Sequence, residues 1–314
     1  MQQYQTCIAL GSKTGISLVS KAPTAQIDAL YQRLWREIFL FERQFSRFLP
    51  GSELSVFNRQ AGSKQAITPE FRDFLLTARA LAHETDGLYN PFILPALQAA
   101  GYVRSRVPGR EQDPADDHSS KSVAAIEQLE IGDNWARIPY GTALDLGGCG
   151  KGYLADKLRN DLPSSITGYW LSFGGDIAAG GLNEDGQPWN IGIQSTADGT
   201  ENIGTYTVTS ACGIATSGVT VHQGSKQGRA WHHIIDPRTL QPAETDVLLA
   251  TVCDSSTLRA DVLASCAVIL GSKQGLAFLR RRNVKAAVLQ YGASVSQRII
   301  KHFGNGIIMG TTHA

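Results

Sequence analysis

Glycine is concentrated in a few short motifs of this 314-residue chain rather than spread evenly along it. The count of 32 glycines is above the average share of about 7%. Because glycine lacks a Cβ atom, it can adopt positive φ and lets a backbone approach a ligand closely. The glycine clusters therefore mark places where the chain turns sharply or can hold a ligand.

Two helices are predicted in the first hundred residues. The clearer one is an amphipathic stripe in which apolar residues recur at steps of three and four from Ile27 to Phe45. Thr24 stands where it can cap this helix. A second helix is expected to begin at Thr68-Pro69, a capping residue followed by proline, and to end near Gly87.

The second half of the chain is predicted to consist mainly of strands. Two earlier strands, 6–10 and 15–20, flank a turn at 11–13, and helices are expected after Gly150 and after Ser256. This pattern favours an α+β fold, a single unit over residues 1–314 with helices packed on mainly antiparallel sheets. The expected later strands are 168–173, 189–194, 206–210, 231–235 and 247–253.

The segment 104–121 is polar and contains two prolines and an acidic run, so we expect a surface loop. A partner-binding segment is the alternative. The five cysteines are odd in number and widely spaced, which favours buried thiols over a disulfide framework or a zinc site.

Composition narrows the class of protein. Apolar residues make up 42% of the chain, which is enough to bury a sizeable core, and the formal net charge is +1. So small a charge argues against a protein that holds nucleic acid through bulk positive charge. No apolar run of about 18 residues and no signal peptide is visible. We therefore expect no membrane span and a cytoplasmic location, or a periplasmic one if a native export signal is missing from this chain.

The densest glycine cluster, 144–152, has four glycines within six positions, includes Lys151, and leads into a predicted helix. Backbone N–H groups at a helix start attract anions, and Lys151 adds a positive charge. The motif therefore predicts a phosphate or pyrophosphate site, although its spacing fits neither the Walker A nor the Rossmann fingerprint. A tight turn in a packed core is the alternative.

Two further motifs place polar groups beside glycine. The segment 172–176 ends in Gly-Gly-Asp after an apolar strand, and its glycines allow another backbone to pass close by. Thr216 and Ser217 precede Gly218, and their hydroxyls suit hydrogen bonds to a polar ligand. A plain turn is the alternative at both places.

Two adjacent histidines, His232 and His233, lie on a strand that Asp236-Pro237 is expected to end. Alternation along this strand places His233 and Ile235 on one face and Ile234 on the other. The two histidines then point to opposite faces and do not share a metal ion. For His233 a structural role is the alternative to a catalytic one.

Asp261 and Ser265 stand four residues apart on the helix expected after Ser256, so they share one face of it. A carboxylate and a hydroxyl on one face suit a hard cation such as Mg²⁺. An exposed polar pair is the alternative.

Taken in order, these motifs resemble the flavin transferases of the ApbE type, the family of FAD:protein FMN transferases. The resemblance covers nearly the whole chain and rests on the order of short motifs, each of which is weak alone. Leu10, Phe48 and Asn90 stand where the family has Met, Tyr and Asp. Leu240 replaces a Gly, so we expect its turn to avoid positive φ. The matching segments are 9–12, 46–58, 87–97, 145–156, 174–176, 215–218, 233–240 and 260–265.

The resemblance implies the family's fold, FAD as substrate and Mg²⁺ as cofactor. It implies that the metal is held by the Gly148 backbone carbonyl, the Asp261 carboxylate and the Ser265 hydroxyl. FMN would move from FAD to a Thr or Ser of an acceptor flavoprotein, and AMP would leave. The residues implied for the FAD site are Leu10, Phe48, Leu88, Tyr89, Asn90, Asp145, Lys151 and Ile235, with Thr216 and Ser217 nearby.

Cleavage of a pyrophosphate requires neutralisation of the charge that develops on phosphate oxygens, a task that suits Mg²⁺ and Lys151. We expect His233 to be the base that takes the proton of the acceptor hydroxyl. Two other functions stay open: an FAD pyrophosphatase that uses water, and a non-catalytic FAD-binding module. Passive binding does not need a metal triad, so the retained Asp261 and Ser265 favour an enzyme. No nucleic-acid partner is expected.

Overall fold

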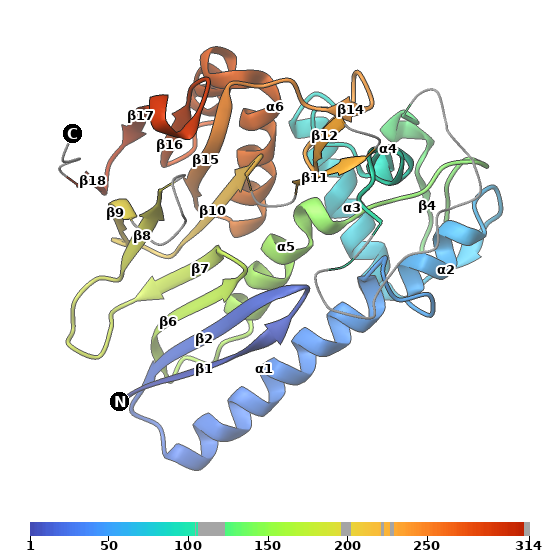
Figure 1. Cartoon of the computed structure of the whole chain (residues 1–314). Helices are drawn as coiled ribbons and strands as arrows, with labels where there is room; N and C mark the ends of the chain where they lie inside the picture. Colours follow the sequence, from blue (N-terminus) through green and yellow to red (C-terminus); the bar gives the residue numbers. More distant parts are fainter. Residues whose placement is uncertain (104, 106–122, 196–201, 221–222, 227–228, 311–314) are drawn as a thin grey trace. The chain divides into compact units, whose positions relative to one another are not determined.

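The computed structural model describes residues 1–103, 105, 123–195, 202–220, 223–226 and 229–310 (Figure 1). Apart from Ser105, the predicted polar loop 104–121 lies outside these residues. Backbone contacts divide the chain into two compact units. The first unit comprises Met1–Phe39, Gly150–Thr220 and Thr245–Ala314, and the second comprises Leu40–Cys149 and Val221–Glu244. Each unit is therefore assembled from segments that lie far apart in the sequence.

The first unit is built on an eight-stranded sheet in the order β1-β2-β6-β7-β10-β15-β16-β17, in which all neighbours are antiparallel. Together with the helices, this sheet confirms the predicted α+β class. Its strands are β1 (Gln2–Ala9), β2 (Ser12–Ser20), β6 (Ile166–Phe173), β7 (Asp176–Gly181), β10 (Cys212–Gly218), β15 (Val247–Asp254), β16 (Ala286–Tyr291) and β17 (Ile299–Gly304).

The hairpin of β1 and β2 turns through Leu10 and Gly11, whose φ angles are +54° and +70°. Ala9 pairs with Ser12, so the turn has two residues and lies slightly earlier than the predicted turn at 11–13. Positive φ at both central residues is typical of the tight hairpin turns that match strand twist.

A smaller sheet in the first unit has the order β18-β9-β8. Its strands are β8 (Asn190–Gln194), β9 (Asn202–Thr207) and β18 (Ile307–Met309). The predicted strand 206–210 is wrong in its bounds, because β9 ends at Thr207 and most of it precedes the predicted start. Apolar residues of β8 and β9 join residues of the large sheet in two buried clusters, which explains why both sheets carry alternating apolar positions.

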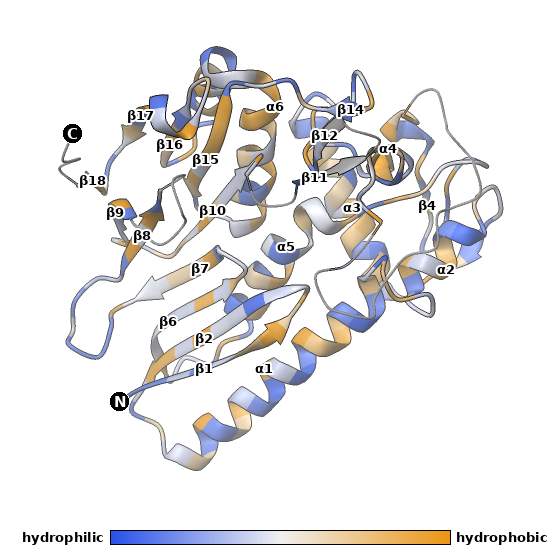
Figure 2. Ribbon diagram, in the orientation of Figure 1, coloured by the Kyte–Doolittle hydropathy of each residue, from blue (hydrophilic) through white to orange (hydrophobic). Residues whose placement is uncertain are grey.

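The helix α6 (Thr257–Arg281) contacts β10 and β15 and is mostly buried. Figure 2 shows β15 as largely hydrophobic, and α6 carries many hydrophobic residues. Within the described part of the chain, α6 alone is long and apolar enough to cross a membrane, but 61% of its apolar window is buried inside the protein. These properties are those of a core helix. Gly271, with φ of +74°, divides it into two helical segments.

The helix α1 (Thr24–Phe45) confirms the predicted stripe, and its alternating hydrophobic and hydrophilic patches are visible in Figure 2. Its last turn belongs to the second unit, where Phe41 and Phe45 pack on Phe74 with ring centroids 5.6 and 5.2 Å apart. The helix α3 (Pro69–Glu84) begins as predicted, since the Thr68 hydroxyl accepts a hydrogen bond from the Phe71 N–H.

The remaining elements of the second unit are short. Two helices, α2 (Glu53–Arg59) and α4 (Leu94–Ala100), were not expected from the sequence. Three small antiparallel groupings of strands complete the unit. They are β3 (Gln65–Ala66), β4 (Glu130–Ile131) and β5 (Trp135–Arg137); β11 (Gln223–Lys226) and β12 (Arg229–His232); and β13 (Ile235–Asp236) and β14 (Gln241–Pro242).

Two expectations about the segment after Trp231 are wrong. The strand predicted over 231–235 is broken, because β12 ends at His232 and β13 starts at Ile235, so Ile234 and Ile235 are both buried instead of alternating. Leu240 adopts positive φ, +60°, although it is not glycine. Its N–H closes the turn on the Asp236 carbonyl, and its side chain packs on a buried cluster that contains Ile235.

The prediction of buried thiols is confirmed for four of the five cysteines, all of which are described and outside any disulfide. Four of them are buried, and Cys7 is partly exposed.

Candidate active site

Lys151 and Asp176 form the charged centre of the first unit. Lys151 lies on α5 (Gly147–Asn160), and its Nζ is 4.0 Å from Asp176 Oδ2 at the start of β7. Burial raises the pKa of Asp176 to about 6, while Lys151 and the Thr216 N–H favour the ionised form. The lysine therefore faces a carboxylate that is costly to keep charged in the absence of a further cation.

Asp261 on α6 is a second buried carboxylate of this centre, with a relative exposure of 7%. Burial and then the charge of Asp176 raise the pKa of Asp261 well above its usual range, against the effects of Lys151 and the Gly152 N–H. Its Oδ2 atom is buried and has no hydrogen-bond partner. An orphaned carboxylate oxygen of this kind is rare and fits a position that a bound cation would satisfy.

Hydroxyl groups lie on the strands that face α6. Ser265 Oγ is 2.8 Å from Ser217 Oγ, so the helix and β10 are joined by a hydrogen bond at this point. Thr216 Oγ1 is likewise 2.9 Å from Thr251 Oγ1 on β15. Because adjacent strand residues point to opposite faces, the Thr216 and Thr251 hydroxyls lie on the face of the sheet away from α6. Asp261, Ser265 and Ser217 therefore supply the carboxylate and hydroxyl oxygens that suit Mg²⁺.

The N-terminus of α6 is fixed by Asp156 on α5. One oxygen of Asp156 accepts from the Thr257 N–H at 2.9 Å, and the other accepts from Ser256 Oγ at 2.6 Å and the Leu258 N–H at 3.1 Å. Gly152 permits the two helices to touch, because a Cβ atom there would lie 2.6 Å from Leu258 Cα. These contacts set the position of Asp261, one turn along the helix.

The Gly174-Gly175 turn brings the tip of the first hairpin to Lys151. Gly174 has φ of +67°, and a Cβ atom on it would lie 2.6 Å from Ser12 Oγ and 3.2 Å from Lys151 Nζ. Leu10, in the hairpin turn, is partly exposed two residues before Ser12. The first unit thus brings together Lys151, Asp261, Ser217 and Ser265, and Thr216 joins them through its backbone N–H, which bonds to Asp176.

In the second unit, Asp145 is almost buried and pairs with Arg47, whose Nε is 2.7 Å from Asp145 Oδ2. Asp145 Oδ1 accepts a hydrogen bond of 2.7 Å from the Gly147 N–H, the first residue of α5. The carboxylate therefore fixes the start of this helix, where Gly147 and Gly148 are exposed.

Aromatic rings gather beside Arg47. The ring centroids of Phe48 and Tyr102 are 5.9 Å apart, and Tyr102 also lies 6.0 Å from Trp231 and 6.2 Å from His233. All four residues are partly exposed. Such a group of rings offers faces on which a flat heterocycle can stack.

The segment 88–90 forms hydrogen bonds to the start of α5 and to neighbouring loop residues. The Tyr89 hydroxyl is 2.9 Å from Cys149 Sγ, and both side chains are buried. The Asn90 amide donates to the Ala124 carbonyl at 3.1 Å and its oxygen accepts from the Phe92 N–H at 3.0 Å. Leu88 is partly exposed. Asn90 therefore acts as a local cap rather than as a charged group.

The histidine segment has two different environments. His232 Nε2 is 3.1 Å from the Ala243 carbonyl, and burial lowers the pKa of His232 while this hydrogen bond opposes the shift. Ile235 is 3% exposed in the cluster with Ala96 and Leu97, so its side chain offers little surface to a ligand. His233 is partly exposed, and its ring lies beside that of Tyr102.

Several residues of these two clusters were missed by the sequence reasoning, namely Asp176, Thr251, Arg47 and Tyr102. Asp176 was noticed only as part of a glycine turn, because its proximity to Lys151 is visible only in the folded structure. Within the described residues, no group of three His, Cys, Asp or Glu side chains could hold a metal ion. A metal in the first unit would therefore depend on hydroxyl or backbone oxygens as well as on carboxylates.

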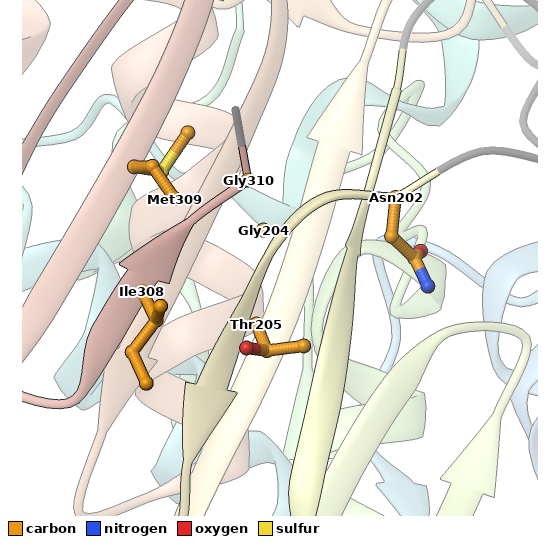
Figure 3. A pocket seen from close by; sticks show the side chains of 6 residues that line it. All are labelled: Asn202, Gly204, Thr205, Ile308, Met309 and Gly310. Atoms are coloured by element: carbon orange, nitrogen blue, oxygen red, sulfur yellow. The ribbon is translucent and has the colours of Figure 1, made fainter. Parts of the chain in front are cut away.

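A pocket opens between β9 and β18, lined by Asn202, Gly204, Thr205, Ile308, Met309 and Gly310 (Figure 3). Its lining contains none of the predicted site residues and no ionisable side chain.

Comparison with known proteins finds relatives that match most of the chain. Relatives named FAD:protein FMN transferase include one from Vibrio cholerae, 26% identical over 283 residues that make up 89% of this chain and 85% of the relative. Another, from Treponema pallidum, is 27% identical over 296 residues, which cover 87% of this chain and 80% of the relative.

Solved structures agree with these relatives. The flavin transferase ApbE from Vibrio cholerae superposes with a TM-score of 0.78 at 25% identity and covers 98% of both chains. An ApbE protein from Thermotoga maritima has the same fold, with a TM-score of 0.82 at 20% identity and 96% of each chain covered. The family model described as "ApbE family" matches residues 10–289. The chain therefore belongs to the ApbE family.

Proposed function

We propose that this protein is a Mg²⁺-dependent FAD:protein FMN transferase. It moves FMN from FAD to a Thr or Ser hydroxyl of an acceptor flavoprotein and releases AMP. The name shared by its relatives supports the transfer of FMN. The observation that carries the proposal is the buried Asp261 carboxylate, which keeps one oxygen without a hydrogen-bond partner close to Lys151 and Asp176.

The donor atoms of the first unit fit Mg²⁺. Asp261 and Ser265 would hold the ion, and the Gly148 backbone carbonyl is the third ligand that the family resemblance implies. When bound, the metal would neutralise charge on the phosphate oxygens of FAD. A cation at Asp261 would also offset the repulsion between its carboxylate and that of Asp176, which explains why two buried acids are tolerated here.

The ammonium group of Lys151 would offset negative charge on the diphosphate of FAD. Asp176 holds its ammonium group near the turn at Gly174, so that the lysine is oriented before substrate binds. In the reaction, the acceptor hydroxyl oxygen forms a bond to the phosphorus of the FMN half. The bond from that phosphorus to the oxygen of the AMP phosphate breaks, and AMP leaves.

His233 is proposed as the base that takes the proton of the acceptor hydroxyl. Its partial exposure and its place beside Tyr102 support this assignment. The flat rings of the flavin and the adenine would be bound by Phe48 and its aromatic neighbours in the second unit, with Leu88, Tyr89 and Asn90 as further lining residues. Leu10 is a predicted FAD contact on the family resemblance alone.

The test measures AMP release from FAD and covalent flavin fluorescence on an acceptor flavoprotein, with Mg²⁺ and with EDTA. We expect both signals only when Mg²⁺ and acceptor are present. Asp261→Asn should lower both by about 100-fold, because the neutral amide lacks the negative charge with which the carboxylate attracts the cation. Asp133→Asn, at an exposed position, is the matched control and should behave as the unchanged protein.

Other outcomes separate the remaining functions. AMP release that does not need an acceptor indicates an FAD pyrophosphatase. Tight, Mg²⁺-independent FAD binding without AMP, repeated with a second acceptor, indicates a binding module and contradicts the transferase.

A further inference from the structure

Arg47 is buried in the second unit and joins groups that are expected to bind FAD. Its relative exposure is 6%, which is unusual for an arginine unless its charge is paired. Its Nε lies 2.7 Å from Asp145 Oδ2, and one terminal nitrogen donates to the Tyr102 carbonyl at 2.9 Å. The guanidinium is thus held in one orientation by hydrogen bonds in two directions.

The same guanidinium lies against two aromatic rings. Its central carbon is 4.1 Å from the ring centroid of Phe48 and 4.7 Å from that of Tyr102. Cation–π attraction of this kind is strongest for a planar guanidinium that is shielded from water. Arg47 therefore sets the position of the Phe48 ring relative to the Asp145 carboxylate.

Asp145 extends this arrangement to the start of α5. Its second oxygen accepts from the Gly147 N–H, next to the exposed Gly148. Because Arg47 neutralises Asp145, the carboxylate can anchor the helix start without adding an unpaired negative charge beside it. An unpaired charge there would oppose a phosphate group, since a helix start otherwise attracts anions.

We propose that Arg47 is a positioning residue for FAD: it fixes the Phe48 ring face and, through Asp145, the start of α5. The inference rests on the proposed function, because it assigns a role within the same substrate site. Lysine cannot replace this arginine, because its ammonium is not planar and cannot bond Asp145 and the Tyr102 carbonyl while it stacks on two rings.

The test compares Arg47→Lys and Arg47→Met with the unchanged protein. FAD affinity is measured by quenching of flavin fluorescence, and KM and kcat for FAD are measured by AMP release. We expect Arg47→Lys to raise Kd and KM about tenfold with kcat changed less than about threefold, which is a loss of binding geometry rather than of chemistry. Arg59→Lys, at an exposed arginine that donates to the Pro50 carbonyl, is the control and should leave Kd unchanged.

A double-mutant cycle with Phe48→Leu tests whether Arg47 acts through the ring. We expect Arg47→Lys to raise Kd less in the Phe48→Leu background than in the unchanged protein, because only the route through Asp145 then remains. Additive effects would overturn the inference. So would an Arg47→Lys protein with a lowered melting temperature and an unchanged Kd, which would show a purely structural role.

The two proposals fail in different ways. A protein that binds FAD but gives neither AMP nor flavin transfer overturns the proposed function, while the Kd values still decide the role of Arg47. A protein without affinity for FAD overturns both.

Discussion

Replacement of Gly152 by alanine tests the contact between α5 and α6 that positions Asp261. The added Cβ would lie 2.6 Å from Leu258 Cα and 2.8 Å from the Thr257 carbonyl oxygen, and both are backbone atoms that cannot rotate away. Ordinary contacts begin near 3.4 Å, so the helices must separate by about 0.8 Å. Because the Gly152 N–H bonds to Asp261, the displacement changes the carboxylate's surroundings directly.

Two effects on stability oppose each other. Overpacking costs about 1–3 kcal/mol, and alanine is favoured over glycine in a helix by about 1 kcal/mol. We therefore expect a free energy of unfolding that is lowered by about 0–2 kcal/mol. The expected loss of activity is larger, because a misplacement of about 1 Å can cost on the order of 100-fold in rate.

Urea denaturation gives the free energy of unfolding, and AMP release in the presence of acceptor gives the rate. Gly51→Ala is the control, since a Cβ at this position would meet nothing within 4 Å. A Gly152→Ala protein that is about 1 kcal/mol more stable than the unchanged protein and equally active would show only the helix-propensity gain. That result would refute the close contact and its role in positioning Asp261.

Replacements at three further positions test other contacts. Asp246 accepts from the Ser272 N–H at 2.8 Å and from Ser272 Oγ at 2.6 Å, and these bonds outweigh burial and lower the pKa of Asp246. Asp246→Asn should therefore lower the free energy of unfolding, measured by urea denaturation at pH 7, by about 1 kcal/mol. The difference in this free energy between the variant and the unchanged protein should shrink as the pH falls below about 4. Leu240→Gly relieves the strain of positive φ but loses packing, so we expect its free energy of unfolding to change by less than about 0.5 kcal/mol. Leu240→Ala keeps the strain and should lower this free energy by about 1 kcal/mol. Equal losses of stability by thermal melting would contradict this reasoning. Tyr89→Phe removes the hydrogen bond to Cys149 and should lower the free energy of unfolding by about 1 kcal/mol. An unchanged melting temperature would argue against this hydrogen bond.

The helices with strong local signals could be predicted from the sequence. The stripe that ends at Phe45 is long enough to define a helical face, and Thr68 caps α3 through a contact only three residues away. The helix α2 has a similar cap, in which Ser52 accepts from the Ser55 N–H at 3.0 Å. It was missed because seven residues are too few to show a helical period.

The errors arise where tertiary contacts decide the backbone. The residues around His233 have the pattern of one continuous strand, which predicts alternating faces over 231–235. In the structure, two separate antiparallel strand pairs, β11–β12 and β13–β14, meet at this place. Leu240 accepts positive φ because its side chain joins the cluster around Leu97, a contact with a residue far away in the sequence. Propensity describes only the local cost of such a conformation and not the packing that offsets it.

The candidate site was predictable as a set of residues but not as an arrangement. Asp261 and Lys151 stand in motifs that indicate a cation and a phosphate. The proximity of Asp261 to Asp176, and the pairing of Asp145 with Arg47, depend on segments that approach each other only in the folded chain. No spacing rule connects residues so far apart, so these charge relations had to come from the structure.

The sheet order also has a consequence for synthesis of the protein. The strand β2 pairs with β6, which leaves the ribosome about 150 residues later. At about 5–20 residues per second, the nascent hairpin waits roughly 8–30 s with one edge of β2 unpaired. That edge includes Ile16, Leu18 and Val19, which are buried in the finished protein. During this period an apolar strand edge is open to pairing with other chains, so the sheet order makes aggregation of the nascent chain a specific risk.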